Sequence, residues 1–162
     1  MSLDIRPAVD ADWPAVWAIL EPVIRAGETY AVDRDLSEAG ARDYWFAPAH
    51  APFLAEDGGQ VLGTYYLRAN FAGGGAHVAN CGYMTARAAQ GRGVARAMCE
   101  HSLDQARARG FRAMQFNCVV STNTRAVALW ESLGFAIVGR LPGAFAHPSL
   151  GEVDALVMYR RL

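Results

Sequence analysis

The segment QGRGVA, residues 90–95, joins a strand-like apolar run at residues 78–85 to a strongly helical run that ends near Arg109. The first N–H groups of a helix lack intrahelical acceptors, and they carry the positive end of the helix dipole. Two glycines at this place leave backbone amides uncovered. The segment therefore predicts either a tight strand-to-helix turn or a cradle for the phosphates of a nucleotide-like ligand.

Two common phosphate-binding loops are excluded by the neighbouring residues. A dinucleotide fingerprint GxGxxG that begins at Gly91 would need glycine or alanine where this chain has Arg96. A GxxxxGK[ST] loop needs a lysine, and all 15 basic residues of the chain are arginine. Neither a dinucleotide loop nor a Walker loop therefore accounts for the turn.

Length and composition limit the remaining classes of protein. A chain of 162 residues with 52% hydrophobic residues predicts one domain, residues 1–162, that buries its own core. A net charge of -1 predicts no general attraction to nucleic acid or to an anionic membrane. The first residues, MSLDIRPAVDAD, lack the apolar centre of a signal peptide, so we expect a cytoplasmic protein. Three scattered cysteines and four scattered histidines give no support for a metal site.

Hydrophobic periodicity predicts the order β-α-α-β-β-β-α-β-α-β-β, a single α/β (α+β) domain with a mixed sheet of about seven strands and helices on both faces. Strands are expected at residues 3–9, 53–56, 61–69, 77–85, 111–120, 135–140 and 153–159. Helices are expected from a cap at Asp12 to a bend or end near Pro22, and at residues 37–45, 91–109 and 123–133. Residues 142–152 are expected to form a loop.

The turn and a second segment together resemble the GCN5-related N-acetyltransferase (GNAT) superfamily. Its Gln/Arg-x-x-Gly-x-Gly/Ala turn is matched by Gln90, Gly93 and Ala95. Its second signature is matched in NTRAVALWESLGF, residues 123–135. HVANCGY, RAMQFNCVVSTNTRAVALWESLGF and GRLPGAF resemble more closely the subgroup that contains the fungal acetyltransferase of azetidine-2-carboxylate and other proline analogues.

The resemblance implies acetyl-CoA as co-substrate, no metal, and a small-molecule amine as acceptor. It implies transfer of the acetyl group to an amino acid or proline-like imino acid, in detoxification or metabolism, and it implies a homodimer. The residues that it places against acetyl-CoA are Tyr83, Met84, Thr85, Gln90, Gly91, Arg92, Gly93, Val94, Ala95, Arg96, Asn123 and Trp130.

One position departs from the pattern of the family. Many relatives carry a tyrosine, which acts as general acid, four residues before the glycine of the second signature, and this chain has Trp130 there. An indole N–H is a very poor acid. The resemblance implies that the asparagines Asn80, Asn117 and Asn123 replace the acid by hydrogen bonding, although each asparagine also has a structural explanation.

The acceptor side of the site is less defined by the sequence. Residues 27–35 form a candidate acceptor loop, in which Glu28 and Tyr30 are candidates for binding the amine or removing its proton. Two other functions stay open. The missing tyrosine suits a non-catalytic acyl-CoA-binding sensor, and an open groove between residues 27–35 and 142–152 would suit a protein or peptide N-acetyltransferase.

Overall fold

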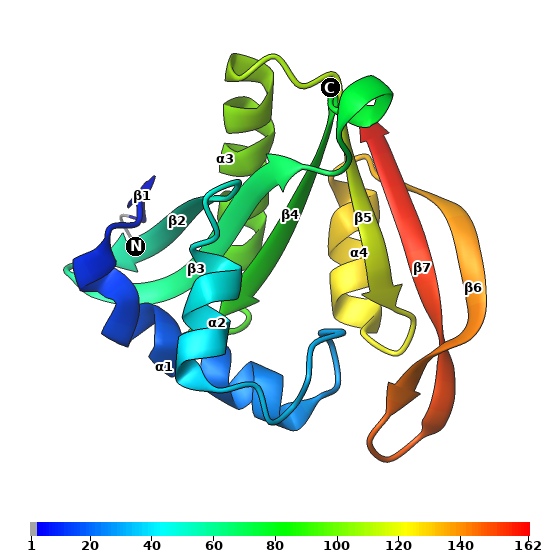
Figure 1. Cartoon of the computed structure of the whole chain (residues 1–162), viewed down its shortest axis with the longest axis horizontal. Coiled ribbons are helices and arrows are strands. Elements are labelled where there is room, and N and C mark those ends of the chain that lie inside the picture. Colours follow the sequence, from blue (N-terminus) through cyan, green and yellow to red (C-terminus); the bar gives the residue numbers. More distant parts are fainter. Residues whose placement is uncertain (1–2) are drawn as a thin grey trace.

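The computed structural model describes residues 3–162 and consists of one seven-stranded mixed sheet with helices on both faces (Figure 1). The strands are β1 (Asp4–Pro7), β2 (Ala51–Asp57), β3 (Gln60–Ala69), β4 (Val78–Thr85), β5 (Ala113–Val120), β6 (Ala136–His147) and β7 (Gly151–Arg161). The helices are α1 (Trp13–Ala26), α2 (Glu38–Trp45), α3 (Val94–Ala108) and α4 (Thr124–Ser132), with short 3-10 turns at Asp10–Asp12, Gly73–Gly75 and Arg87–Ala89. The predicted fold class and element order are confirmed.

The strands lie in the order β1-β2-β3-β4-β5-β7-β6. Every neighbouring pair is antiparallel except β4 and β5, which run parallel and are joined by α3. A tight turn at Gly58 and Gly59 connects β2 to β3, and both glycines have positive φ, as a two-residue hairpin turn favours. The single parallel pair lies at the centre of the sheet.

Two hydrophobic clusters fill the two faces of the sheet. On one face α1 and α2 pack through Leu20, Ile24 and Trp45 against Tyr66 and Met84 of the strands. On the other face α3 and α4 pack against residues of β3, β4 and β5, and this cluster includes Val94, Met98, Leu103, Met114, Phe116 and Trp130. Burial of such side chains contributes about 1.5 to 3 kcal/mol each, so both helix pairs are held firmly on the sheet.

Helix α1 continues through Pro22 to Ala26, four residues beyond the predicted bend or end. Pro22 is exposed and removes only one helical hydrogen bond. Leu20 and Ile24, on the buried face, keep the helix packed on both sides of the proline. Tertiary packing therefore outweighs the local cost of the proline, and the helix stops instead at Gly27, which has a φ of 67°.

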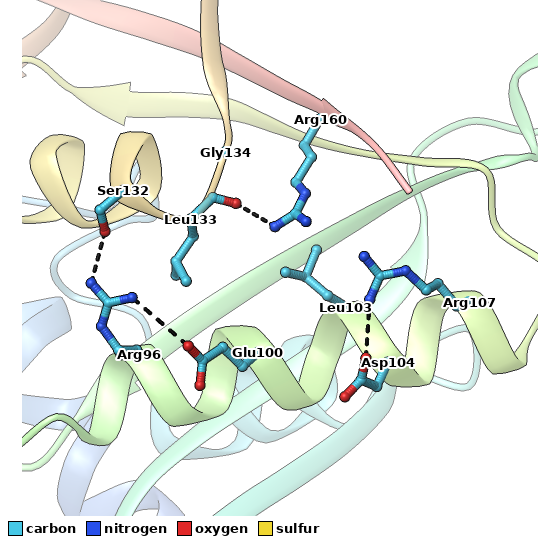
Figure 2. A pocket seen from close by; sticks show the side chains of 9 residues that line it. All are labelled: Arg96, Glu100, Leu103, Asp104, Arg107, Ser132, Leu133, Gly134 and Arg160. Carbon is cyan, nitrogen blue, oxygen red and sulfur yellow. Dashed lines mark hydrogen bonds and ion pairs between the residues drawn. The ribbon is translucent and has the colours of Figure 1, made fainter.

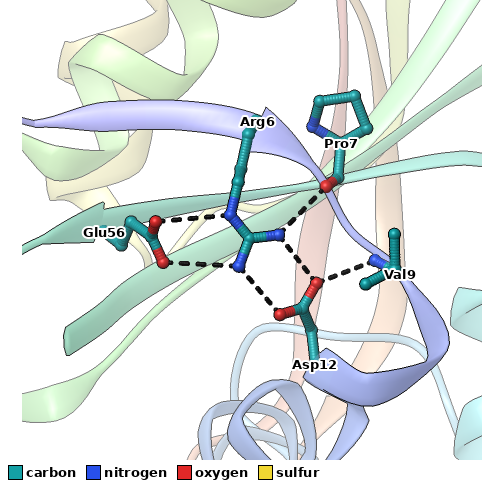
Figure 3. A network of polar contacts seen from close by, with 5 residues as sticks. All are labelled: Arg6, Pro7, Val9, Asp12 and Glu56. Carbon is teal, nitrogen blue, oxygen red and sulfur yellow. Dashed lines mark hydrogen bonds and ion pairs between the residues drawn. The ribbon is translucent and has the colours of Figure 1, made fainter. Parts of the chain in front are cut away.

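Asp12, the predicted cap of α1, makes no capping hydrogen bond to the helix. Its carboxylate accepts two hydrogen bonds of 2.9 Å from the Arg6 guanidinium and one of 2.8 Å from the Val9 N–H (Figure 3). Arg6 Nε also donates to Glu56 at 3.3 Å. These bonds with Arg6 hold the pKa of Asp12 below its ordinary value, and the network ties β1 to β2 and to the start of α1.

Residues 142–152, predicted as a loop, mostly form the ends of β6 and β7. Phe145 pairs with Val153 and His147 with Gly151, after a register shift between Leu141 and Phe145. The prediction was wrong because the pairing partner of this irregular, proline-containing segment lies on β7, which local periodicity does not reveal. Within residues 3–162, no helix is both long enough and apolar enough to cross a membrane.

Candidate active site

The parallel strands β4 and β5 separate soon after they begin to pair. Only Val78–Ala113 and Ala79–Met114 are in register, although each strand has 8 residues. A bulge between Phe116 and Val119 also interrupts the pairing of β5 with β7. The carboxyl ends of β4 and β5 therefore diverge (Figure 1), and a cleft of about 730 Å³ is lined by both strands, by residues 29–32 and by the start of α4.

The three free cysteines differ in their surroundings. Cys118 is half-buried and lines the cleft. Cys81 and Cys99 are buried free thiols, and burial raises the pKa of each to about 12. Both thiols are therefore protonated at neutral pH.

The segment QGRGVA forms an open turn at one end of the cleft. Gly91 and Gly93 have φ values of 76° and 81°, so both occupy the left-handed region that favours glycine. Helix α3 begins at Val94, three residues later than predicted, and no described side chain caps it. No heavy atom lies within 4 Å of the place where a Cβ would stand on Gly93. The uncapped amides and this open space can hold a phosphate group.

The predicted cofactor residues mostly line the cleft. They include Tyr83, Met84, Thr85, Gln90, Gly91, Gly93, Val94, Ala95, Arg96, Asn123 and Trp130. Arg92 does not line it, because its guanidinium turns away to Asp57, 3.9 Å distant. A lining residue that the sequence analysis missed is Arg125 on α4, whose Nη2 lies 3.7 Å from the Cβ position of Gly91. Arg125, rather than Arg92, is thus the arginine next to the turn.

Beyond Ala79, the edge of β4 that faces the gap has no strand pairing with β5. The Tyr30 hydroxyl donates a hydrogen bond of 2.9 Å to the carbonyl oxygen of Tyr83. In an extended strand the N–H of a residue lies on the same side as its carbonyl group, so the Tyr83 N–H also faces the gap. A Cβ on Gly82 would stand 2.7 Å from the Tyr66 ring and 2.9 Å from the Tyr30 hydroxyl. Glycine at position 82 therefore lets both tyrosines approach this edge.

The three predicted asparagines all line the cleft, and each has a structural hydrogen bond. Asn80 Nδ2 donates to the Gln115 carbonyl at 2.9 Å, immediately after the backbone pairing of β4 and β5 ends. The Asn80 side chain thereby bridges the two strands at the apex of the gap. Asn123 caps α4, because its Oδ1 accepts from the Ala126 N–H at 3.4 Å.

The third asparagine, Asn117, is not buried in the sheet. It is exposed in the bulge of β5. Its Nδ2 donates to Asn70 Oδ1 at 2.7 Å, and its Oδ1 accepts from Gln115 Nε2 at 2.9 Å. Asn70 Nδ2 is buried and has no acceptor among the described residues. Side-chain amides from β4, from β5 and from the residue after β3 therefore gather around the apex of the gap.

Trp130 closes the base of the cleft. Its ring centroid lies 5.2 Å from that of Tyr83 and 5.2 Å from that of Phe116, and only 8% of its surface is exposed. The Tyr83 hydroxyl lies 2.6 Å from Ser102 Oγ on α3, and burial raises the pKa of this phenol well above 10. Trp130 thus belongs to the core and lines the cleft at the same time.

The other end of the cleft has an aromatic wall made by Tyr30, Tyr44 and Tyr66. The hydroxyls of Tyr44 and Tyr66 lie 3.0 Å apart, and the Trp45 ring stands 4.9 Å from Tyr66. Burial raises the pKa of Tyr30 well above 10, so its hydroxyl is protonated at neutral pH. Glu28 is exposed and does not line the cleft, because α1 ends at Gly27 and the cleft-lining part of the loop begins only at Thr29.

Sequence reasoning missed the basic residue of this wall. Arg68 is half-buried, lines the cleft and lies opposite Asn80 in the β3–β4 ladder. Its signal in the sequence was a single charge at the end of the otherwise uncharged run from residue 60 to residue 69. Within residues 3–162, no group of three or more His, Cys, Asp or Glu side chains is placed to hold a metal ion.

A second cavity of about 570 Å³ lies between α3, the end of α4 and β7 (Figure 2). Its charged groups already have partners in the protein. Arg107 pairs with Asp104 at 3.0 Å, and Arg96 lies 3.8 Å from Glu100 and donates to Ser132 at 2.8 Å. Arg160 donates to the carbonyl of Leu133. This groove therefore consists of satisfied surface contacts, whereas the cleft between β4 and β5 has strand edges without strand pairing.

The mixed sheet that opens between β4 and β5, with a glycine turn beside the opening, defines the acyl-CoA N-acyltransferase fold. The model of the acetyltransferase (GNAT) family matches residues 13–135. The chain belongs to this family, and the family predicted from the sequence is confirmed.

Individual relatives agree with this assignment. A GCN5-related N-acetyltransferase from Kribbella flavida is 48% identical, with a TM-score of 0.95 over 99% of this chain and 98% of that chain. A ribosomal-protein-alanine N-acetyltransferase from Brucella melitensis is 26% identical, with a TM-score of 0.84 over 98% and 99% of the two chains. N-acetyltransferase aca1 of Schizosaccharomyces pombe (strain 972 / ATCC 24843) is 27% identical over 137 residues, which cover 75% of this chain and 66% of that protein.

Proposed function

We propose that this protein transfers the acetyl group of acetyl-CoA to the amine of a small molecule, an amino acid or a proline-like imino acid. The observation that carries the proposal is one continuous cleft along the edge of β4. The glycine turn at residues 90–93 lies at one end of this cleft, and the aromatic wall of Tyr30, Tyr44 and Tyr66 lies at the other end. Both substrates fit the two ends of one cavity, which supports direct transfer within a ternary complex. Membership of the acetyltransferase family supports acetyl-CoA as the donor.

In this mechanism the neutral amine attacks the thioester carbonyl in the gap between β4 and β5. A nitrogen–carbon bond forms, the carbon–sulfur bond breaks, the attacking nitrogen releases one proton to water, and CoA leaves as a thiolate that takes a proton from water. The Tyr83 N–H faces the gap and donates to the oxygen on which negative charge develops. Tyr30 bonds the Tyr83 carbonyl of the following peptide unit and thereby holds the Tyr83 backbone in place.

Asparagine amides replace the missing tyrosine in the proposal. Asn80, Asn117 and Asn123 line the cleft. Trp130, which has no hydroxyl group, lines it as well. Asn117 Nδ2 carries two N–H groups, and one of them is directed to Asn70. The second can donate to the sulfur as charge builds on it. Such a bond is strongest in the transition state, so it raises turnover more than ground-state binding.

Water is the proton carrier for the acceptor. The described residues that line the cleft include no Asp, Glu or His, and Tyr30 stays protonated because burial raises its pKa well above 10. The amine therefore loses its proton to solvent before it attacks. This supports an acceptor that is small enough to bind while water still reaches its nitrogen.

Two observations favour other functions strongly enough to test. Trp130 removes the acid of many relatives, which favours an acyl-CoA-binding sensor without catalysis. The relative from Brucella melitensis is a ribosomal-protein-alanine N-acetyltransferase, which favours a peptide amino terminus as acceptor.

One experiment separates the three functions. The purified protein is mixed with acetyl-CoA and with amino acids, imino acids, polyamines, aminoglycosides or peptides, and release of the CoA thiol is followed. We expect release with a subset of the amino or imino acids. Release with peptides alone would support the peptide function, and tight acetyl-CoA binding with no release on any acceptor would support the sensor.

The role of Asn117 is tested with the acceptor found in that panel. Asn117→Ala should lower kcat about 10²- to 10³-fold, as loss of one oxyanion donor does in other enzymes, while Kd for acetyl-CoA changes less than threefold. The Kd measurement is the control for a general loss of structure. Unchanged turnover would remove Asn117 from the mechanism.

A further inference from the structure

Arg68 is a half-buried cation whose charge has no counter-ion within residues 3–162. It extends from β3 at the apex of the gap, and its Nε donates to Asn80 Oδ1 at 3.3 Å. In the described part of the chain it forms no ion pair, so the two terminal nitrogens of the guanidinium lack a carboxylate partner. A partly buried charge is costly unless it is paired.

The neighbours of Arg68 do not supply the missing negative charge. Tyr66 lines the same chamber, and burial raises its pKa far above 10, so it is neutral. His50 stacks on Tyr66 with ring centroids 4.3 Å apart. Burial, with a smaller effect from the charge of Arg68, lowers the pKa of His50 below 6.5 and leaves this ring neutral as well.

The charged side chains that line the described part of the cleft are all positive. The charged residues that line the described part of the cleft are Arg68, Arg96 and Arg125. Arg96 pairs with Glu100, and Arg125 stands beside the phosphate turn at Gly91. Arg68 is thus the lining cation on the acceptor side. Acceptors with several positive charges, such as polyamines or aminoglycosides, would meet repulsion there without any compensating carboxylate.

We propose that Arg68 binds the carboxylate of the acceptor, so that the acceptor is a free α-amino or α-imino acid and not an amide, an ester or a polyamine. This inference rests on the proposed function. The guanidinium forms a two-pronged contact with a carboxylate, and the Asn80 side chain positions it from one side. Asn80 is in turn fixed by its bond to the Gln115 carbonyl.

The spacing along β4 agrees with an α-amino acid. Asn80, opposite Arg68, precedes Tyr83 by three residues, which corresponds to about 10 Å along a strand. In an α-amino acid the amine nitrogen and the carboxyl carbon lie about 2.5 Å apart. An attack distance and a hydrogen bond of about 3 Å each extend this span to about 8.5 Å, about 1.5 Å less than the spacing along the strand. The long side chain of Arg68 can cover this difference, so the carboxylate contacts Arg68 while the amine attacks a thioester held at the Tyr83 N–H.

The test compares Arg68→Gln with wild type on paired acceptors. L-proline and L-azetidine-2-carboxylate are each assayed beside their carboxamides, along with the best acid of the panel and its carboxamide. For wild type we expect kcat/KM for each accepted acid to exceed that for its amide at least 50-fold. Arg68→Gln should lower kcat/KM for the acid about 30- to 100-fold, mainly through KM, and should change that for the amide less than threefold.

Two further variants make the outcome specific to the carboxylate. Arg68→Lys keeps the positive charge but lacks the planar guanidinium that bonds both carboxylate oxygens. Its kcat/KM for the acid should lie between the values for Arg68→Gln and wild type. Arg112→Gln removes one exposed positive charge outside the cleft and should leave the preference for acids unchanged. Equal losses for acid and amide in Arg68→Gln, or a wild-type enzyme that accepts amides as well as acids, would refute the proposal.

A binding measurement separates this inference from the proposed function. Titration of the CoA-saturated protein with L-proline and with L-prolinamide does not require turnover. Binding of the acid alone, lost in Arg68→Gln, would support the carboxylate site even if no acetyl transfer occurred. Acetyl transfer to amines that lack a carboxylate would instead uphold the enzyme and overturn the role of Arg68.

Discussion

Replacing Gly93 by alanine places a methyl group in the open turn at the start of α3. Gly93 has a φ of 81°, and an L-residue in this region costs about 1 to 2 kcal/mol of stability. The methyl group itself meets no heavy atom of the protein within 4 Å, so no steric clash adds to that cost. It stands, however, in the space where a phosphate would contact the backbone amides.

The expected loss of binding follows from this geometry. Displacing a phosphate oxygen from one amide removes a charge-assisted hydrogen bond of about 1.5 to 3 kcal/mol. That loss corresponds to about a 10- to 150-fold increase in Kd for acetyl-CoA. Isothermal titration of the purified variant with acetyl-CoA measures the Kd, and urea denaturation measures the free energy of unfolding.

Gly110 provides a matched control at the other end of the same helix. Its φ is 83°, its Cβ position is also free of atoms within 4 Å, and it does not line the cleft. Helix α3 has 15 residues, so its two ends are about 22 Å apart. Gly110→Ala should therefore lose a similar amount of stability while Kd stays at the wild-type value. Equal Kd values in the two variants would show that the turn does not bind acetyl-CoA.

Three other changes test the remaining parts of the structure. Tyr30→Phe removes the donor to the Tyr83 carbonyl and should lower the free energy of unfolding by about 1 kcal/mol and kcat about tenfold, measured by denaturation and single-turnover assays. The rate should rise with pH, with a midpoint that follows the pKa of each acceptor's own amine; one midpoint for all acceptors would indicate a base in the protein. Asp12 has a lowered pKa, so its stabilisation is present above its ordinary pKa and is lost as pH falls below it. Asp12→Asn should be less stable than wild type by up to about 1 kcal/mol at pH 7, and a difference that stayed constant down to pH 2.5 would contradict the role of the Arg6 pair.

Local sequence signals predicted the strands and helices well and their limits less well. The turn at residues 90–93 and the cap at Asn123 follow from residues next to each other, so both were visible before folding. The continuation of α1 through Pro22 and the hairpin at residues 142–152 depend on packing and pairing with distant residues. The periodicity of a short window carries no information on such partners.

The candidate site also has one part that neighbouring residues determine and another part that depends on distant residues. The glycine turn lies within one continuous segment, so its glycines alone indicated a candidate phosphate site. The acceptor chamber combines residues 29–32 with Tyr44, Tyr66 and Arg68, which belong to separate elements. Two predicted residues lie outside the cleft lining: Glu28 precedes the part of its loop that lines the cleft, and the guanidinium of Arg92 turns to Asp57.

The sequence by itself thus determined the family, the order of the elements and the place of the glycine turn, because glycine positions and hydrophobic periods act through neighbouring residues. Only the tertiary structure decided how the gap is built and charged. The divergence of β4 from β5, the bridge from Asn80 to Gln115 and the position of Arg68 opposite Asn80 all join residues far apart in the chain. The sheet brings them together because strand pairing, and not sequence proximity, fixes which side chains share one cleft.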